Sequence, residues 1–442
     1  MDWLVLFAIK KLRKANFQFS IFNFQFSIKC RTFAPMNTLH THRRTAIVGG
    51  GAAGFFCAIQ LGTMCPDMEI TIFEQQQRVL RKVEISGGGR CNCTNTFADV
   101  TDLCQVYPRG AKLMKRLMKQ FGPRDAFAWF ERHGVPLTVQ PDQCVFPKAQ
   151  DSHAIIRCFL DEAQRLGVRL QVGQKVEDPR DLLATHDFVV VTTGGMLHTV
   201  RQDELWDEPL VRPVPSLFTF NIPDAALHQL MGIVVEHAVC SIPGTRFRAK
   251  GPLLLTHWGM SGPAILKLSS YAARHLAEAD YQVLLSVSWA GENNADAVRA
   301  YLPDLLSNHS TKLTENLHPF GLNARLWAYL LDKVQLSGKR AGELGKKSIN
   351  RLTELLTNDL YQISGRSPYK DEFVTCGGIS LDAVHSQTLE SRRTPHLFYA
   401  GEVLDIDGIT GGFNFQAAWT TAYAVACGIG RYLQQNTGYS NE

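Results

Sequence analysis

Residues 44–54 read Arg-Thr-Ala-Ile-Val-Gly-Gly-Gly-Ala-Ala-Gly. Residues 45–48 predict a short buried strand, and residues 55–61, which follow, have helical character. Gly49, Gly51 and Gly54 have the spacing G-x-G-x-x-G at the turn between them. In such a turn the glycines permit the tight bend, the approach of a pyrophosphate and the packing of helix on strand. We therefore predict a dinucleotide site at the N-terminus of this helix, with Ala52 and Ala53 beside it.

A second strand is predicted over residues 69–73, and it ends at Glu74, 20 residues after Gly54. A carboxylate in this position accepts hydrogen bonds from the ribose hydroxyls of a dinucleotide. No arginine follows immediately, which disfavours a 2′-phosphate on that ribose. The glycine motif alone does not distinguish FAD from NAD.

Three further glycine-containing segments are candidates for the same site. Residues 85–95 carry three consecutive glycines, whose N–H groups suit an anion or an electron-rich ring edge. Residues 188–195 predict a buried strand that ends in Gly-Gly, and residues 396–416 predict a strand, a turn with acids and a helix start. The helix predicted over 417–432 would direct its positive N-terminal end at a bound ring. The cofactor-binding candidates in these segments are Gly87, Gly88, Gly89, Arg90, Cys91, Asn92, Thr193, Gly194, Gly401, Glu402, Asp405, Gly411, Gly412, Phe413 and Asn414.

Together these segments resemble the FAD-dependent oxidoreductases that include aminoacetone oxidase-type and bile-acid 4,6-dehydro reductase-type proteins. The most specific pieces of the resemblance are residues 86–95, 253–264, 374–379 and 399–419. The resemblance implies non-covalently bound FAD. It also implies an α/β fold, in which a Rossmann-like FAD-binding domain is built from both chain ends and carries an inserted β-rich domain and a small helical domain.

The chain departs from this family in two places, and it has one candidate catalytic side chain. The glycine-rich stretch expected after Gly195 is missing from residues 196–216, and Cys376 stands where a small residue is usual. Cys376 is either a redox thiol beside the flavin or a buried apolar side chain. His257 could deliver or accept a proton near neutral pH, or it could fix a loop between domains.

The domain boundaries follow from these segments. We expect the first part of the FAD-binding domain at 44–195, an inserted β-rich domain at 196–290, a helical subdomain at 291–345, the return of the insertion at 346–373 and the second part of the FAD-binding domain at 374–442. Residues 1–43 predict an unstructured or mis-annotated extension, because a near-copy of residues 16–21 recurs at 23–28 and Met36 precedes the first strand. A surface amphipathic anchor is the alternative for this extension.

Composition limits the other classes of function. The net charge of the 442 residues is +5, but the first 35 residues hold six Lys and Arg against one Asp, so the remainder is formally neutral. Because residues 36–442 carry no net charge, the folded protein has no overall positive potential to attract a polyanion, and we expect no nucleic-acid partner. The 11 cysteines form no paired framework or metal-binding spacing, so we expect reduced thiols, no metal and a cytoplasmic protein without a membrane partner.

The expected function is therefore FAD-dependent oxidation–reduction. Only one good dinucleotide fingerprint occurs, so NAD(P)H would act as a transient donor that enters through the cleft of the insertion. The first hypothesis is NAD(P)H-linked reduction of a small conjugated or carbonyl-containing molecule. The alternatives are an amine oxidase that uses O₂ on an aminoacetone-like substrate, an RNA-modifying flavoprotein and a non-catalytic flavin-binding protein. Substrate identity and oligomeric state are unknown at this stage.

Overall fold

The protein is represented by a computed structural model, which describes residues 43–196, 204–366 and 374–437. Its first layer is a five-stranded parallel sheet in the order β17-β7-β1-β2-β6. The central strand β1 is buried from Thr45 to Val48 because helices cover both faces of a parallel sheet. The strands are β1 (Arg44–Val48), β2 (Glu69–Glu74), β6 (Arg169–Val172), β7 (Phe188–Val191) and β17 (Leu397–Tyr399).

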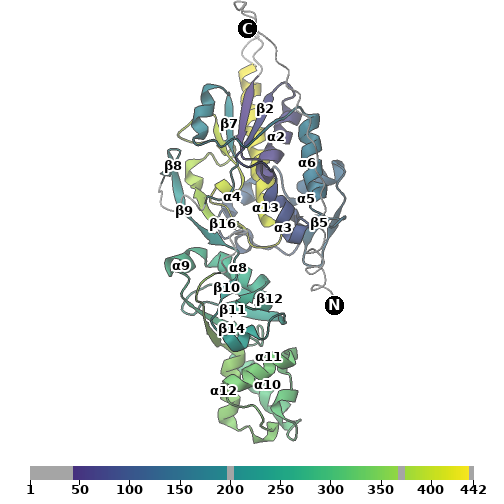
Figure 1. Cartoon of the computed structure of the whole chain (residues 1–442), viewed down its shortest axis with the longest axis vertical. Helices are drawn as coiled ribbons and strands as arrows, with labels where there is room; N and C mark the ends of the chain where they lie inside the picture. The colour runs from purple at the N-terminus through teal and green to yellow at the C-terminus, as the bar shows by residue number, and fades with distance from the viewer. Residues whose placement is uncertain (1–42, 197–203, 367–373, 438–442) are drawn as a thin grey trace, which may run out of the picture. The chain divides into compact units, whose positions relative to one another are not determined.

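Two helices from opposite ends of the sequence pack side by side against this sheet. They are α2 (Ala52–Met64) and α13 (Phe413–Thr437), and Figure 1 shows them in purple and yellow. Every residue of α2 from Ala53 to Gly62 is buried, as expected for a helix enclosed on all sides. An aromatic cluster joins the two helices, with the Phe56 and Trp419 ring centroids 5.3 Å apart. Both ends of the chain therefore build one core, as the sequence predicted.

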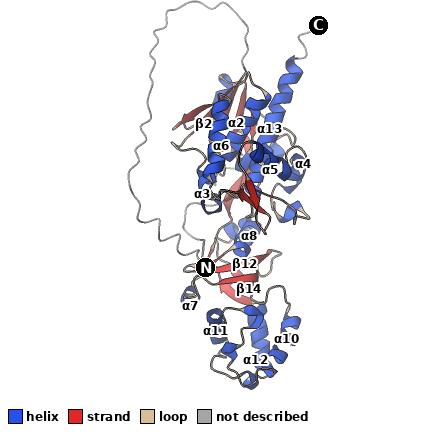
Figure 2. Cartoon of the chain, turned by 90° about the vertical axis from the view of Figure 1, so that its right-hand side faces the viewer, coloured by secondary structure: helices blue, strands red, loops and turns tan. Residues whose placement is uncertain are grey.

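The rest of this domain surrounds the sheet with helices and a small antiparallel sheet in the order β3-β5-β4. Figure 2 shows the helices around the sheet. The strands are β3 (Thr94–Asn95), β4 (Leu137–Val139) and β5 (Cys144–Pro147). The helices are α3 (Arg81–Gly89), α4 (Ala111–Leu117), α5 (Pro123–Arg132) and α6 (His153–Arg165), with 3₁₀ turns at Leu103–Gln105, Pro179–Ala184, Leu381–Ala383 and Gly401–Val403.

The insertion starts with a strand that pairs with the returning chain. β9 (Glu208–Ser216) lies antiparallel between β8 (Glu204–Leu205) and β16 (Val374–Ile379). The chain then forms a six-stranded sheet in the order β10-β13-β12-β11-β14-β15. Its strands are β10 (Phe220–Asn221), β11 (Val234–Ser241), β12 (Arg248–Thr256), β13 (Gly259–Ser261), β14 (Leu284–Ser288) and β15 (Asp359–Gln362), and its helices are α7 (Ala225–His228), α8 (Pro263–Tyr271) and α9 (Ala273–Glu278).

A helical subdomain follows β14 and shares the core of the six-stranded sheet. Its helices are α10 (Ala295–Ser307), α11 (Ala324–Lys333) and α12 (Lys346–Thr357), with 3₁₀ turns at Thr314–Asn316, Pro319–Gly321 and Ala341–Glu343. Leu326 and Trp327 of α11 belong to the same buried cluster as Leu285 and Val287 of β14. The inserted β-rich and helical parts are therefore packed as one unit.

The observed elements refine the expected boundaries. The boundary predicted at residue 345 falls just before α12, which packs on α10 and so completes the helical subdomain. β15 then returns to the six-stranded sheet through its pairing with β14. The expectations for residues 1–42 and for part of the shortened segment after Gly195 lie outside the described residues. No described helix is both long enough and apolar enough to cross a membrane.

Candidate functional site

A cavity of about 440 Å³ lies at the carboxyl ends of the parallel strands β1, β2, β7 and β17. This edge of an open α/β sheet is where such folds bind ligands. Segments from both ends of the chain line the cavity. They are residues 49–53, 74–75, 78, 80–82, 85–87, 92, 192–194, 217, 374, 401–402, 406, 409–412, 414–415 and 417–418.

The turn between β1 and α2 forms the first wall. Gly49 has a φ of +115°, and a Cβ there would lie 2.5 Å from the carbonyl oxygen of Thr192, so only glycine fits. Gly51 caps α2, and a Cβ there would meet no atom within 4 Å, so its backbone faces open space. The N-terminal N–H groups of α2 and their partial positive charge suit a pyrophosphate in this space.

Glu74 is fixed at the end of β2 by two backbone groups. Its Oε2 accepts a hydrogen bond from Gly50 N at 2.7 Å, and its Oε1 accepts one from Gln76 N at 2.8 Å. These bonds hold the carboxylate against the glycine turn, beside the cavity that it lines. The arrangement suits contact with the ribose next to a pyrophosphate.

The start of α13 forms the opposite wall and is clamped by β3. Asn95 Nδ2 donates to Gly411 O at 3.0 Å, and Trp419 Nε1 donates to Cys93 O at 2.8 Å. At Gly412, which has a φ of +88°, a Cβ would lie 2.2 Å from the carbonyl oxygen of Thr94. Because these two segments lie close together, the N-terminus of α13 is held beside the cavity. Its partial positive charge would there stabilise negative charge on a bound ring.

A charged pair lies between the two walls. Lys82 of α3 and Glu402 form an ion pair with 2.7 Å between Nζ and Oε2, and both side chains line the cavity. The other carboxylate oxygen of Glu402 accepts a hydrogen bond from Thr375 N at 2.8 Å. Glu402 therefore connects α3 to β16, the strand that returns from the insertion.

Leu217 contributes the insertion's side of the cavity from a strained backbone. Its φ is +58°, a left-handed value that costs energy for a side chain branched beyond Cβ. Its neighbours hold it in place: Ser216 Oγ donates to Asp407 Oδ2 at 3.2 Å, and Phe218 N donates to Ser269 Oγ at 3.0 Å. The side chain is thus fixed as an apolar cover on the cavity.

Asp407, which holds Ser216, is itself buried in an ion pair with Arg109. Arg109 Nε donates to Asp407 Oδ1 at 2.5 Å, and its Nη1 donates to the carbonyl oxygen of Ser270 on α8 at 2.7 Å. The pair therefore joins the domain of the parallel sheet to the insertion next to Leu217.

Several residues predicted from the sequence do lie around the cavity. They are Gly49, Gly51, Ala52, Ala53, Glu74, Gly87, Asn92, Thr193, Gly194, Gly401, Glu402, Gly411, Gly412 and Asn414. Others are near the site but do not line it. They are Gly54, Gly88, Gly89, Arg90, Cys91, Asp405 and Phe413.

The structure gives a reason for five of these seven exceptions. Gly54 packs on the turn, since a Cβ there would lie 2.0 Å from Gly49 O. The side chain of Arg90 lies over the Phe146 ring, with Cζ 4.4 Å from the ring centroid. Cys91 is fully buried, and burial raises the pKa of its thiol to about 12. Asp405 pairs with Arg274, and the Phe413 carbonyl accepts a hydrogen bond from Tyr107.

Neither His257 nor Cys376 is brought to the cavity. His257 is exposed in the turn between β12 and β13, where its ring contacts Trp258. Cys376 is fully buried in β16, and burial raises the pKa of its thiol to about 11. These positions favour the loop reading for His257 and the packing reading for Cys376.

Sequence reasoning missed other lining residues. Ser86 directly precedes the glycine run and Lys82 lies five residues before Gly87, so the run itself was the available signal. Val374 opens the segment 374–379, which carries part of the family resemblance. Leu217 carries no local signal, because it reaches the cavity only where the chain crosses into the insertion.

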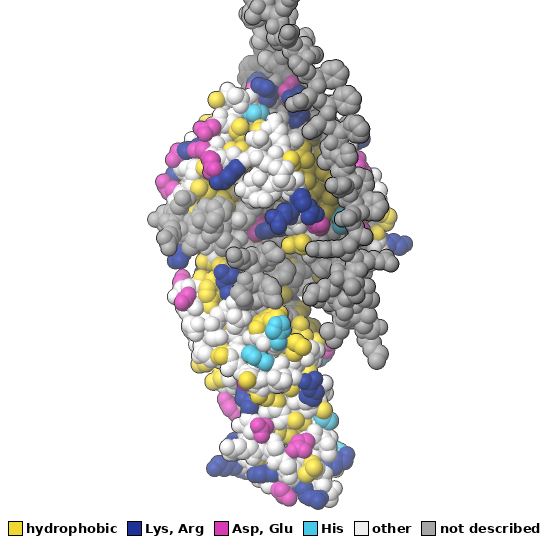
Figure 3. Space-filling model, viewed as in Figure 1, with side chains coloured by type: hydrophobic (Ala, Val, Ile, Leu, Met, Phe, Trp, Pro, Cys, Tyr) yellow, Lys and Arg dark blue, Asp and Glu magenta, His cyan; other side chains and the backbone are white. Residues whose placement is uncertain are grey.

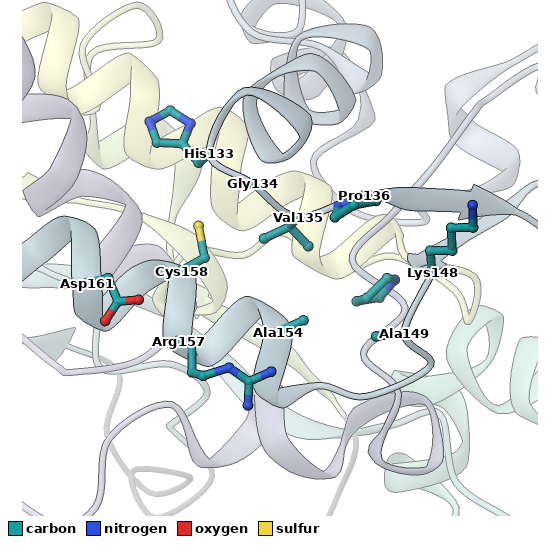
Figure 4. Close-up of a pocket in the computed structure, with 11 residues that line it drawn as sticks. His133, Gly134, Val135, Pro136, Lys148, Ala149, Ala154, Arg157, Cys158 and Asp161 are labelled. Carbon is teal, nitrogen blue, oxygen red and sulfur yellow. The ribbon is translucent and has the colours of Figure 1, made fainter.

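A second pocket, of about 490 Å³, lies apart from the predicted residues, between the α5–β4 loop and one face of α6. Figure 4 shows Lys148 on the β5 side of this pocket and Arg157 and Asp161 on α6. The pocket is lined by cationic and anionic side chains and by apolar side chains, which include Val135 and Cys158. The lining of this pocket includes neither a glycine turn before a helix nor an acid at the end of a parallel strand, the two features that suit a dinucleotide in the first cavity.

The first cavity fits FAD. A pyrophosphate has open space at Gly51, an adenosine ribose has Glu74, and a flavin ring has the N-terminus of α13 and the apolar cover of Leu217. The residues that would hold the cofactor come from both chain ends, in agreement with the predicted architecture.

Comparison with known proteins gives one family and several relatives. A family model described as the HI0933-like protein Rossmann domain matches residues 43–428. The chain is 28% identical over 414 residues to the ribosomal RNA dihydrouridine synthase of Escherichia coli, covering 86% of this chain and 96% of that protein. It is 26% identical over 425 residues to the ribosomal RNA dihydrouridine synthase of Haemophilus influenzae, covering 87% and 98%.

A further relative is the 3-dehydro-bile acid delta(4,6)-reductase of Clostridium scindens, at 26% identity over 411 residues, covering 86% of this chain and 97% of that protein. Among solved structures, a 3-ketosteroid delta1-dehydrogenase from Sterolibacterium denitrificans aligns with a TM-score of 0.43 at 10% identity, covering 88% of this chain and 99% of that one. A flavocytochrome c3 fumarate reductase aligns with a TM-score of 0.39 at 13% identity, covering 88% and 78%.

Proposed function

The chain belongs to the HI0933-like Rossmann family, an FAD-dependent family, and from that premise we propose that it reduces a carbon–carbon double bond conjugated to a carbonyl group, with NAD(P)H as the electron donor. The coarser statement, that it is an FAD-dependent oxidoreductase, follows from family membership. The proposal adds the reaction class and the donor.

The names of the relatives support this reaction class. Dihydrouridine is uridine whose C5–C6 double bond, conjugated to the C4 carbonyl, has been saturated. A delta(4,6)-reductase of a 3-dehydro bile acid saturates a double bond conjugated to the 3-oxo group. Both products differ from their precursors by a hydride added to one conjugated carbon and a proton added to its neighbour. In the proposed reaction of this chain, the two electrons leave NAD(P)H as it becomes NAD(P)⁺. One reaction type therefore accounts for two different substrates.

The cavity between the two chain ends is the observation that carries the proposal. Bound FAD would supply hydride transfer there. The N-terminus of α13 would stabilise negative charge at one edge of the ring. The ion pair of Lys82 and Glu402 would keep α3 next to residues 401–402, between the two walls of the cavity. Leu217 would exclude water from the cavity and keep its surface apolar on the side of the insertion.

Two substrate classes are consistent with this reaction. The first is a uridine in ribosomal RNA, which is favoured by the names of two relatives that cover nearly the full length of both chains. The second is a small fused-ring ketone, favoured by the name of the bile-acid reductase.

The test is a pair of half-reactions with the FAD-loaded full chain. Under anaerobic conditions, NADH or NADPH should bleach the absorbance of the oxidised flavin. Addition of in vitro transcribed ribosomal RNA, or of a conjugated 3-oxosteroid, should then restore that absorbance, and mass spectrometry should find two added hydrogens in the product. Restoration by RNA alone would select the uridine class.

The alternatives make opposite predictions in the same experiment. An amine oxidase would not be bleached by NADH or NADPH, but an aminoketone would bleach it and O₂ would then yield peroxide. A non-catalytic flavin protein would be bleached by none of these donors. Either outcome would contradict the proposed reductase.

A further inference from the structure

The formal neutrality of the chain beyond residue 35 conceals an uneven distribution of charge. Residues 308–351 contain eight Lys and Arg against three Asp and Glu, a net charge of +5. Residues 36–307 and 352–442 together must therefore carry −5. The segment with the excess positive charge is the helical subdomain from the end of α10 into α12.

Six exposed cations from three segments of this subdomain form what we call the basic edge. The segment at 311–314 runs beside 338–341, with Ala341 N donating to Lys312 O at 2.9 Å and Thr314 N donating to Lys339 O at 2.9 Å. The chain then enters α12, where Lys347 and Arg351 are one helical turn apart. The basic edge consists of Lys312, Lys339, Arg340, Lys346, Lys347 and Arg351.

These cations have no anionic partners among the described residues, and Arg340 Nη1 donates to the carbonyl oxygen of Thr311 at 3.0 Å. None of the six side chains forms an ion pair with a described residue. The acids nearest in sequence are Glu315, Glu343 and Glu354, and they already accept hydrogen bonds from Gly338 N at 2.7 Å, Arg340 N at 3.2 Å and Asn358 Nδ2 at 2.8 Å. Figure 3 shows dark blue side chains along the lower end of the molecule, over the helical subdomain of Figure 1.

The basic edge is separate from the cavity. The helices of this subdomain pack on one another and on β14 and β15, and the six-stranded sheet lies between them and the FAD-binding domain in both Figures 1 and 2. A small substrate in the cavity could not contact both places. A long polyanion could lie on the basic edge while one of its units enters the cavity.

We propose that the basic edge is a docking surface for the phosphate backbone of a structured RNA, one nucleotide of which is the substrate of the cavity. The proposal rests on the proposed reductase function only in the identity of that nucleotide, a uridine with a conjugated double bond. Unpaired lysines and arginines on an exposed surface are the side chains that bind RNA phosphates, and they do so without reading sequence. This inference reverses the expectation of no nucleic-acid partner, which rested on total charge alone.

The test compares two variants that each remove three lysines. The first, K339Q/K346Q/K347Q, lies in the basic edge. The second, K112Q/K115Q/K119Q, removes three exposed lysines along and just after α4 of the FAD-binding domain. Binding of fluorescently labelled, transcribed ribosomal RNA to the FAD-loaded full chain is measured by anisotropy at several salt concentrations.

Wild-type protein should bind this RNA with a strong dependence on salt. The basic-edge variant should bind at least about tenfold more weakly at low salt, and its slope of log K against log salt should be smaller by about 1 for each lysine that contacts a phosphate. The α4 variant should resemble wild type. Equal losses in both variants, no loss in the first, or tighter binding to phosphatidylserine vesicles than to RNA would each overturn the proposal.

A second readout separates this proposal from the proposed function. Bleaching of the flavin by NADH or NADPH should be the same in wild type and in the basic-edge variant, because the substitutions lie outside the cavity. RNA binding that depends on the basic edge, without saturation of any uridine, would contradict the uridine assignment but leave the docking surface in place. Saturation of uridine at an unchanged rate by the basic-edge variant at low RNA concentration would contradict the docking surface alone.

Discussion

Gly51 and Gly54 lie in the same turn of α2, but an added methyl group should affect them differently. A Cβ at Gly51 meets no protein atom within 4 Å and projects into the space assigned to the pyrophosphate. A Cβ at Gly54 would lie 2.0 Å from Gly49 O, so it collides with the turn itself. We expect G51A to keep the melting temperature of the FAD-free protein while weakening FAD binding at least about tenfold, a loss of about 1.4 kcal/mol.

G54A is the matched substitution, and it should lower the melting temperature of the FAD-free protein by several degrees, since a core clash costs about 1–3 kcal/mol. Differential scanning fluorimetry and flavin titration measure both quantities. Unchanged FAD affinity in G51A would show that the pyrophosphate does not approach this glycine.

Glu208 supports a prediction about pH. Its side chain is fully buried at the start of β9, Ser391 Oγ donates to its Oε1, and its Oε2 has no hydrogen-bond partner among the described residues. Burial raises the pKa of this carboxyl above its ordinary value. A carboxyl with a raised pKa in the folded state gives its full stability below the unfolded pKa and loses it as pH rises through the folded pKa.

The stability of the wild type should therefore contain a component that falls as pH rises above about 4.3, the ordinary pKa of glutamic acid. E208Q keeps the shape and cannot ionise, so its urea midpoint relative to wild type should increase with pH over this window. Midpoints measured at a series of pH values test this, and a constant difference between the two proteins would show that Glu208 ionises equally well in the folded and unfolded chains.

At the scale of elements, one buried carboxylate joins the helical subdomain to the six-stranded sheet. Asp359 of β15 accepts hydrogen bonds from Trp289 Nε1 at 2.9 Å and from the Tyr361 hydroxyl, and it pairs with Lys333 of α11 at 2.5 Å. Lys333 also lies over the Tyr361 ring, 4.1 Å from its centroid. D359A should destabilise the insertion by about 3–5 kcal/mol, because it leaves a partly buried cation and a buried indole N–H without partners.

K333M is the matched control. Lys333 is partly exposed, and methionine replaces its stem in the same packing, so the loss should be smaller than in D359A. Urea unfolding followed by tryptophan fluorescence compares the two variants, since Trp289 and Trp327 of the insertion are among the seven tryptophans of the chain. A greater loss in K333M than in D359A would contradict the assignment of Asp359 as the centre of this network.

Elements near the cavity differ in how well their sequences predict them. The turn of Gly49, Gly51 and Gly54 was recognisable because a buried strand precedes it and a helix follows it, so its chemistry is local. Leu217 was not recognisable, because the pairing of β9 with β16 brings it to the cavity. The basic edge could have been found from a running sum of charge, but its three segments converge only in the folded chain.

At the scale of the whole molecule, the FAD-binding domain is closed by contacts between residues more than 300 positions apart. Asn95 bonds to Gly411 and Cys93 bonds to Trp419 across this separation. The resemblance stated from the sequence predicted that both chain ends form one domain, since its most specific segments lie at both ends. It could not predict that the β-rich and helical parts of the insertion share one core, because that depends on packing between α11 and β14.

This architecture predicts that removal of FAD loosens both ends of the chain together and leaves the insertion unchanged. Bound FAD at 100 times its dissociation constant would stabilise the folded domain by about 2.7 kcal/mol. Hydrogen exchange of the FAD-free protein should therefore increase in the turn at 49–54 and at the start of α13 to a similar extent, while α11 and α12 keep their protection. Faster exchange at only one chain end, or equally faster exchange in the helical subdomain, would contradict a cofactor held by both ends, because a ligand that bridges two segments protects both and protects little beyond them.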